Sequence, residues 1–316
     1  MKKDASKPLT TSGVVIFLAV FCNFLWGSAF PGIKIGYKLF QIDGSDTFSQ
    51  ILFAGCRFTL AGILTILIGS ISSRKVLLPN KGNAKKILIL ALFQTILQYI
   101  FFYIGLANTT GVKASIIEGA NVFIVIILSA LIFKMEKNAA AKLLGCIPGF
   151  IGVVLVNLSG SGLTFSFNIA GEGFILISTF SAAMAAVLIK RFSVNENPVL
   201  LSGYQFMTGG VVMVIAGIIG GGRLTISSLG CLFIILYLAF VSAAAYSIWG
   251  LLLKYNPVSK ISVYGFTNPV FGVILSAIVL HESTDAFGIV TVISLVLVCL
   301  GIYLVNSKPR GLLNSN

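Results

Sequence analysis

Charged side chains are scarce in this chain of 316 residues. Only 10% of the residues are Asp, Glu, Lys or Arg, whereas 57% are hydrophobic. A soluble domain carries about 25% charged residues because its surface faces water. Acidic residues are rarer still, nine against 22 Lys and Arg. The composition excludes an ordinary soluble fold and predicts an integral membrane protein.

Histidine is almost absent, and cysteine follows no useful pattern. The only histidine, His281, lies beside Glu282 and Asp285 in a predicted loop, which excludes a multi-histidine metal site and His-dependent chemistry inside the membrane. The five cysteines fall in apolar stretches at no metal-like spacing, and an odd number cannot pair completely. No Gly-x-x-x-x-Gly-Lys-Ser/Thr loop occurs, which argues against ATP hydrolysis. We expect no metal and no cofactor.

Long apolar runs make up most of the chain. A helix that crosses a hydrocarbon core of ~30 Å needs about 20 apolar residues. Ten stretches approach that length: 12–35, 47–71, 87–107, 114–133, 140–158, 169–189, 200–220, 230–253, 259–280 and 286–305. The loops between them leave no room for a soluble catalytic or nucleotide-binding domain. We predict an all-α integral membrane protein with ten transmembrane helices.

The basic residues are distributed unevenly between the loops. Seventeen of the 22 Lys and Arg occupy the amino terminus, every second loop and the carboxyl tail. By the positive-inside rule these segments are cytoplasmic, so residues 1–11 and 307–316 are predicted to be cytoplasmic tails. We expect a multi-pass protein of the plasma membrane, in bacteria the inner membrane. The net charge of +13 fits this pattern and does not indicate a nucleic-acid partner.

The chain contains an internal repeat. Residues 99–130 align with residues 246–277, and the match extends outwards in both directions. Well-matched positions are Tyr99 and Tyr246, Asn121 and Asn268, Phe58 and Phe206, Gly55 and Gly203, Gly62 and Gly210, Lys34 and Lys190, and Gly152 and Gly301. Residues 12–158 and 169–306 are therefore predicted to be two five-helix repeats. Because five is an odd number of crossings, the second copy enters the membrane from the opposite side and is inverted relative to the first. Inverted repeats are typical of secondary transporters, whose substrate site lies near the midplane of the membrane.

Two ionisable residues stand out within the predicted spans. Such a group costs at least ~2.5 kcal/mol in hydrocarbon unless it faces a cavity or a partner. Two roles are open for Glu118. In the functional one, it binds a cationic group of a substrate or carries a coupling proton. In the structural one, it is a fixed partner of Arg57, Lys113 or Lys34 that locks helices together. We favour a structural or gating role for Arg57, because Gln205 at the matching position is neutral.

Other polar and aromatic side chains of the spans are candidates to line a cavity. Gln94 and Gln98 lie one helical turn apart, and amides in lipid need partners, so we expect them to point inwards. Pro31 is expected to break the first span, which suits a cavity wall. The candidate cavity or coupling residues are Glu118, Arg57, Asn23, Trp26, Gln94, Gln98, Tyr99, Ser115, Asn121, Ser242, Tyr246, Trp249 and Asn268.

Several motifs together resemble the EamA-type branch of the drug/metabolite transporter superfamily. They are the opening Phe24-Leu-Trp-Gly-Ser-Ala-Phe-Pro-Gly-Ile-Lys34, the pair Arg57-Phe58, the acids Glu136 and Glu282, and a Gly-rich last span in each half. The resemblance covers about residues 13–306. It implies two inverted five-helix repeats around a central cavity lined by spans one, three, four, six, eight and nine. The chain departs from the general pattern at Glu118, and at Val122, where the second copy has Pro269.

These observations predict a secondary-active transporter that works by alternating access, with export as the expected direction. The resemblance implies a small organic metabolite, such as an amino acid or a related compound, as substrate. Expected partners are this substrate, the lipid bilayer and a coupling proton or counter-solute, in a monomer or homodimer. The alternatives are a membrane channel, a lipid scramblase or flippase and, less favoured, an intramembrane enzyme.

Overall fold

Helices dominate the structure. The computed structural model describes residues 8–109, 114, 117–136, 138–158, 167–280 and 289–307, and none of these lies in a β-strand. In chain order the elements are η1 (Pro8–Thr10), α1 (Ser12–Phe40), α2 (Thr47–Ser73), α3 (Lys81–Leu90), η2 (Ala91–Leu97), α4 (Gln98–Ala107), α6 (Asn121–Ile127), η3 (Leu128–Ile132), α7 (Ala139–Leu158), η4 (Ile169–Gly173), α8 (Phe174–Phe192), α9 (Pro198–Ile219), α10 (Leu229–Tyr255), α11 (Val258–Ser262), η5 (Val263–Phe266), α12 (Thr267–Leu280) and α13 (Ile289–Asn306). η2, η3 and η4 are π-helical, whereas η1 and η5 are 3-10 turns.

Eight helical stretches among the described residues are long and apolar enough to cross a membrane. They are Ser12–Phe40, Thr47–Ser73, Gly82–Leu106, Ile169–Phe192, Pro198–Ile219, Leu229–Tyr255, Val258–Leu280 and Ile289–Asn306. Each overlaps one of the ten predicted spans. Two shorter apolar helices, Ile117–Ile132 and Ala139–Leu155, lie where the fourth and fifth spans were predicted.

Helix α1 is uninterrupted, so the predicted break at Pro31 is wrong. The helix continues through Pro31 and ends at Phe40. Proline removes one backbone donor from the ladder, a loss that membrane helices tolerate where a neighbouring helix packs against them. Here Pro31 and Gly32 are buried, and Gly32 lies against Leu238 of α10. Helix α1 therefore remains one element through Pro31, where it packs against α10.

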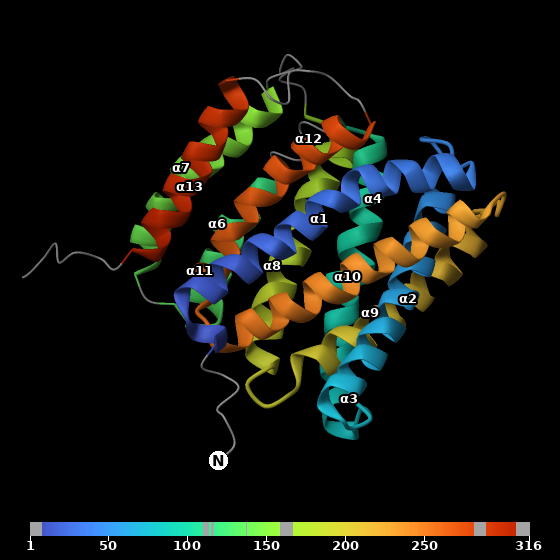
Figure 1. Cartoon of the computed structure of the whole chain (residues 1–316), viewed down its shortest axis with the longest axis horizontal. Coiled ribbons are helices and arrows are strands. Elements are labelled where there is room, and N and C mark those ends of the chain that lie inside the picture. Colours follow the sequence, from blue (N-terminus) through green and yellow to red (C-terminus); the bar gives the residue numbers. More distant parts are fainter. Residues whose placement is uncertain are drawn as a thin grey trace, which may run out of the picture.

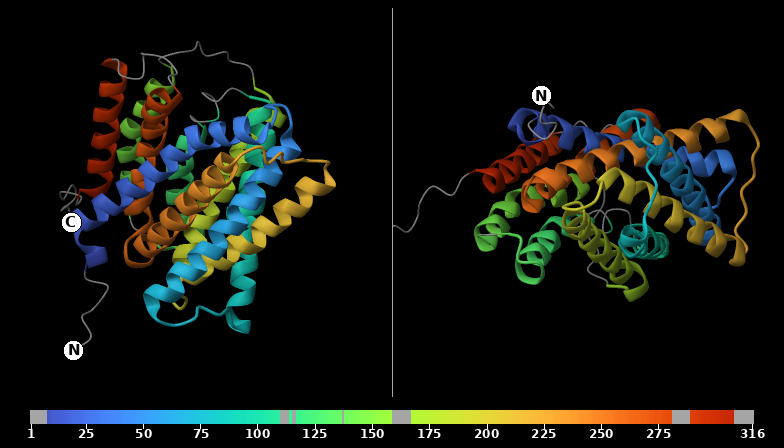
Figure 2. Two further views of the ribbon diagram at one scale, coloured as in Figure 1. Left: turned by 45° about the vertical axis from the view of Figure 1, so that its right-hand side comes forward. Right: turned by 90° about the horizontal axis from the view of Figure 1, so that it is seen from below.

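Glycines bring two pairs of helices into close contact. A Cβ added to Gly62 of α2 would lie 2.5 Å from the backbone nitrogen of Met207 and 2.6 Å from the carbonyl oxygen of Gly203, both on α9. On the other pair, a Cβ added to Gly301 of α13 would lie 2.7 Å from the backbone nitrogen of Gly149 on α7. Small residues of this kind let membrane helices associate closely. The pair α7 and α13 forms one edge of the bundle, and α2 and α9 lie side by side towards the other (Figures 1 and 2).

Apolar side chains cover much of the outside. Ile219 is 82% exposed, Ile71 76% and Phe17 68%, whereas the polar side chains of Asn23 and Ser242 are fully buried. In a soluble protein, Ile and Phe are among the residues most often buried, and Asn and Ser are mostly exposed. An apolar groove on this outer surface is lined by Gly13, Ile16, Phe17, Val20, Phe21, Phe24 and Phe271. The exposed surface is suited to lipid, and the polar groups gather inside.

Candidate functional site

Two pairs of aromatic residues from matching positions of the internal repeat meet inside the bundle. The hydroxyl oxygens of Tyr99 on α4 and Tyr246 on α10 are 2.9 Å apart, although the residues are separated by 147 positions. The rings of Phe58 on α2 and Phe206 on α9 stack with centroids 5.3 Å apart and an angle of 12° between their planes. We call these four residues the central aromatic cluster. Each member contacts its own counterpart, so the two copies of the repeat meet here.

Arg57 lies directly beside this cluster and is 3% exposed. Its Nε and Nη2 atoms donate to the Ser242 hydroxyl oxygen at 3.2 and 3.0 Å. Its guanidinium carbon lies 4.8 Å from the centroid of the Phe58 ring. Arg57 forms no ion pair with any residue that the structure describes. The guanidinium is thus held by a neutral hydroxyl and an aromatic face.

The second copy makes the same contact without the charge. The shift of 147 positions that aligns Tyr99 with Tyr246 also aligns Thr95 with Ser242. Thr95 donates its hydroxyl hydrogen to Oε1 of Gln205 at 2.7 Å, and Gln205 is the counterpart of Arg57. One contact therefore occurs twice, with a cation in the first copy and a neutral amide in the second.

A further pair of hydrogen bonds follows the same correspondence. The Cys22 thiol on α1 donates to the carbonyl oxygen of Ala245 at 3.4 Å. At the matching positions, the Ser178 hydroxyl on α8 donates to the carbonyl oxygen of Gln98 at 2.7 Å. Helices α1 and α8 therefore lie against α10 and α4 in equivalent ways.

Two tryptophans extend the central aromatic cluster. The Trp26 ring lies 5.0 Å from that of Tyr246 and 5.1 Å from that of Trp249, in both cases edge to face. Trp26, Tyr99 and Tyr246 stay partly exposed although they lie inside the bundle. Nε1 of Trp26 has no hydrogen-bond partner among the described residues. The Gln98 side chain lies near the Tyr246 hydroxyl. Six predicted site residues thus gather around Tyr246: Trp26, Arg57, Gln98, Tyr99, Ser242 and Trp249.

Glu118 lies at the start of the helical stretch Ile117–Ile132 and is partly exposed. It forms no ion pair with Arg57 or with any other residue in the described ranges. The Tyr246 hydroxyl is within electrostatic range of both Glu118 and Arg57. The acid and the buried cation therefore flank the same tyrosine without neutralising each other.

The remaining candidate residues lie around this group. Asn23 is fully buried and donates Nδ2 to the carbonyl oxygen of Ala19 at 2.8 Å, and Asn121 donates to the carbonyl oxygen of Thr179 at 3.1 Å. Oδ1 of Asn23, Oδ1 of Asn268 and Oε1 of Gln94 are buried without a partner among the described residues. Ser115 lies outside the described residues. Each of these three oxygens can accept a hydrogen bond that no described residue donates.

Two tyrosines near Arg57 were not predicted as site residues. Tyr37 and Tyr103 lie near each other, and both lie near Arg57. Tyr103 follows Tyr99 by one helical turn, so that spacing was a usable signal. Tyr37 sits on a different helix, α1, and no sequence pattern connects it to Arg57.

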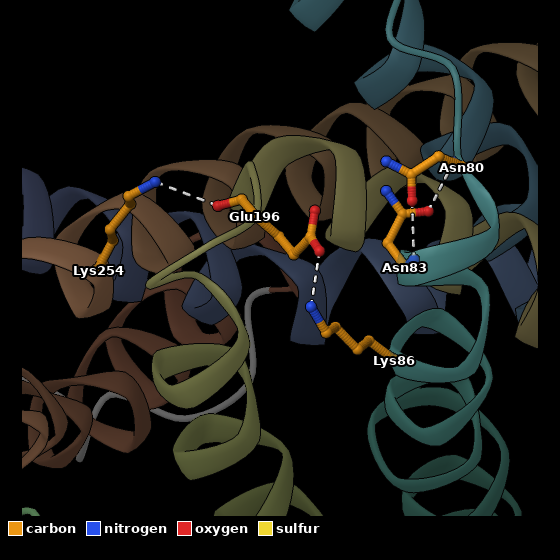
Figure 3. Close-up of polar contacts among 5 residues, drawn as sticks. All are labelled: Asn80, Asn83, Lys86, Glu196 and Lys254. Atoms are coloured by element: carbon orange, nitrogen blue, oxygen red, sulfur yellow. Dashed lines mark hydrogen bonds and ion pairs between the residues drawn. The ribbon is translucent and has the colours of Figure 1, made fainter.

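Polar contacts also join the two copies at one end of the bundle. Nζ of Lys86 on α3 lies 2.6 Å from Oε1 of Glu196, and Nζ of Lys254 on α10 donates to the carbonyl oxygen of Glu196 at 3.1 Å (Figure 3). Asn80 and Asn83 cap the start of α3 beside them, each side chain accepting the other's backbone N–H (Figure 3). Basic residues concentrate in these loops, so the contacts fix the two copies on the predicted cytoplasmic side.

Comparison with known families identifies both halves of the chain. The model of the EamA-like transporter family matches residues 13–158 and, a second time, residues 169–307. These two ranges nearly coincide with the repeats predicted from the internal alignment.

Individual relatives are similar over almost the full chain. An uncharacterized transporter of Archaeoglobus fulgidus is 27% identical over 93% of this chain and 97% of its own length. The uncharacterized inner membrane transporter YedA of Escherichia coli K12 is 27% identical over 93% of this chain and 94% of its own. The WAT1-related protein At3g02690 of Arabidopsis thaliana, a chloroplastic protein, is 25% identical over 91% of this chain and 68% of its own.

The fold also occurs among solved structures. One crystal structure superposes with a TM-score of 0.73 and covers 91% of this chain and 96% of its own. Its sequence is 14% identical, so this likeness concerns the fold alone.

Proposed function

Because the chain belongs to the EamA-like transporter family, we propose that it is a secondary-active carrier that exports a small organic metabolite, such as an amino acid or a related compound. Membership makes it a multi-pass membrane transporter and not an enzyme, as the names of its relatives also indicate. The resemblance inferred from the motifs is confirmed.

The carrier is proposed to consist of two inverted five-helix repeats. Reciprocal contacts support this: a Cβ on Gly55 would meet Gly210, whereas one on Gly62 would meet Gly203, and each glycine thus contacts the counterpart of the other. A two-fold axis generates such reciprocal pairs, and residues on the axis contact their own counterparts. Two pairs contact their own counterparts in this way: Tyr99 with Tyr246, and Phe58 with Phe206. In Figure 1, α1 begins and α13 ends at the same end of the bundle, in keeping with two cytoplasmic termini.

The central aromatic cluster is the proposed substrate site. In carriers built from inverted repeats the site lies at the interface of the repeats, and alternating access moves one repeat against the other around it. The hydrogen bond between Tyr99 and Tyr246 is the observation that carries this assignment, because it links the two copies at matching positions inside the bundle. Each copy contributes half of such a site, so relative motion exposes it to one side and then to the other.

Glu118 is proposed to bind a cationic group of the substrate or to carry a coupling proton. An acid in an apolar helix that has no fixed cationic partner is expected to face a cavity. Its partial exposure and the lack of an ion pair with any described residue support this role.

Counterflow in proteoliposomes tests the proposal. Purified protein is reconstituted, vesicles are loaded with one amino acid or related metabolite at a time, and uptake of the labelled form is followed. A carrier gives saturable uptake that the loaded solute stimulates. Flux that rises without saturation would identify a channel, and movement of labelled phospholipid between leaflets without solute flux would identify a scramblase.

A further inference from the structure

We propose that Arg57 binds the carboxylate of the transported molecule, which makes the substrate an organic acid with a flat, apolar body. This assignment rests on the proposed function, because it places the substrate at the central aromatic cluster. It gives Arg57 a recognition role in place of the structural or gating role that the sequence favours.

The charge on Arg57 has no counter-ion among the residues that the structure describes. Among the acidic residues that the structure describes, only Glu118 and Glu172 lie within apolar helical stretches, Glu118 in the shorter Ile117–Ile132 and Glu172 in Ile169–Phe192. Glu172 accepts hydrogen bonds from Thr109 and from the backbone nitrogen of Asn168, and neither acid forms an ion pair with Arg57. A buried cation without an opposite charge is strongly unfavourable, and an anionic ligand from outside the protein would supply that charge.

The geometry of the guanidinium suits a carboxylate. Arginine has five N–H groups in a planar fork, and two of its nitrogens, Nε and Nη2, are directed at the Ser242 hydroxyl. The edge formed by Nη1 and the second N–H of Nη2 makes no hydrogen bond to a described residue. That edge matches the two oxygens of a carboxylate, which forms paired, charge-assisted hydrogen bonds with arginine.

The groups around Arg57 add donors and apolar faces. Trp26, whose ring packs on Tyr246, has an Nε1–H without a partner among the described residues. Tyr99 and Tyr246 supply one further hydroxyl hydrogen, because only one of them donates in their mutual bond. Unpaired donors around a cation favour an anionic ligand, and the rings of Trp26 and Trp249 offer flat apolar surface to the rest of it.

Only the first copy of the repeat carries the cation. The second copy has Gln205 at the matching position, where Oε1 accepts from Thr95. One carboxylate per molecule is therefore expected, not one per repeat. The asymmetry also supplies a matched variant, because Arg57→Gln gives the first copy the residue that the fold already accommodates in the second.

Intrinsic fluorescence provides a direct test, since the only two tryptophans, Trp26 and Trp249, both line the site. Purified protein is titrated at constant ionic strength with acetate, with 3-phenylpropionate and with 3-phenylpropanol, in which a hydroxymethyl group replaces the carboxylate. We expect saturable changes with both acids, and an affinity for the alcohol lower by about tenfold or more, the effect of a hydrogen bond to a charged group. Inorganic phosphate is included to separate carboxylate from phosphate recognition.

The variants decide the assignment. Arg57→Gln should lose the preference for the acid over the alcohol, Arg57→Lys should keep part of it, and Arg223→Gln, which removes an exposed loop cation, should keep all of it. No saturable effect of either acid on the wild type, or an unchanged preference in Arg57→Gln, would overturn the proposal. A preference for phosphate would overturn the choice of carboxylate.

Transport is measured separately on the same preparations. If ligand binding depends on Arg57 but no counterflow is observed, the proposed carrier function is contradicted and the carboxylate site at Arg57 is retained. If counterflow is observed but ligand binding does not depend on Arg57, the carboxylate site at Arg57 is contradicted and the proposed carrier function is retained. Gel filtration of each variant shows that it is folded, and Arg57→Lys carries the test if Arg57→Gln does not fold.

Discussion

Glu118 has an unusual position for a carboxylate, since it lies in an apolar helix, is partly exposed and forms no ion pair with the residues described. An acid that served only to lock helices together would be expected to have a fixed cationic partner. We therefore predict that Glu118→Gln abolishes transport or uncouples it from pH while the protein is made and folds as before. The measurement is counterflow in proteoliposomes across a range of pH, with expression and gel filtration in parallel.

Asp43→Asn is the matched control for this experiment. Asp43 is an exposed acid in the loop after α1, and a hydrogen bond from the Ser45 side chain keeps the pKa of its carboxyl below the usual value. A lowered pKa means that Asp43 stays ionised as the pH falls to the ordinary carboxyl range, so it should contribute no pH dependence near neutrality. Unchanged flux and unchanged pH dependence in Glu118→Gln would remove Glu118 from the mechanism.

At the level of single residues, the internal repeat predicted which positions correspond but not which ones touch. Tyr99 and Tyr246 align in the sequence, and only the fold shows that their hydroxyls meet. Contacts between Arg57 and Ser242 depend on how α2 crosses α10, which no local spacing encodes. Tyr37 was missed for the same reason, because its relation to Arg57 is purely tertiary.

The helices show a corresponding division between what was predictable and what was not. Hydrophobic run length located eight helices of membrane-spanning length to within a few residues, because helix length and membrane thickness are linked, whereas the fourth and fifth predicted spans coincide with shorter apolar helices. Local irregularities were missed. The stretch from 258 to 280 contains the 3-10 turn Val263–Phe266, and the stretch from 82 to 106 contains the π-helical Ala91–Leu97. These depend on how neighbouring helices pack and carry no composition signal.

Close packing of α2 on α9 leads to a prediction for glycine. Gly62→Ala places a methyl group 2.5 Å and 2.6 Å from backbone atoms of α9, which cannot move aside as a side chain would. We predict a loss of about 1–3 kcal/mol in stability, the usual cost of overpacking. Gly13→Ala is the control, since nothing lies within 4 Å of its added Cβ and the change should be neutral or stabilising by up to ~1 kcal/mol.

Thermal unfolding in detergent, followed by tryptophan fluorescence, measures both variants. Gly203→Ala should fall between them, because its closest contact at 2.7 Å is the Ile66 side chain, which can change rotamer. Equal stability of Gly62→Ala and Gly13→Ala would show that α2 and α9 are not closely packed in the membrane.

For the whole molecule, contacts between the copies occur at both ends of the bundle. On the predicted cytoplasmic side Lys86 pairs with Glu196, and the Ser259 backbone nitrogen donates to Glu136 at 2.9 Å. At the other end the Arg223 backbone nitrogen donates to the Ser49 hydroxyl at 2.8 Å. The proposed alternating access would require the contacts at one end to open while those at the other end persist, so the two ends would differ in strength during the cycle. Partly exposed ion pairs such as Lys86 with Glu196 contribute only ~1 kcal/mol or less, which makes them suitable for reversible opening.

Inverted repeats make a prediction about sidedness that a parallel duplication does not. The loop between α1 and α2 and the loop between α8 and α9 occupy matching positions in the two copies, so inversion places them on opposite faces of the membrane. Gly44 and Asn195 are exposed in these loops. After replacement of the five native cysteines by alanine, Gly44→Cys should react with a membrane-impermeant maleimide added to intact cells, whereas Asn195→Cys should react only after the cells are opened. If both cysteines are labelled from outside, or if neither is, the copies are not inverted. The reciprocal glycine contacts would then need an explanation other than a two-fold axis in the membrane plane.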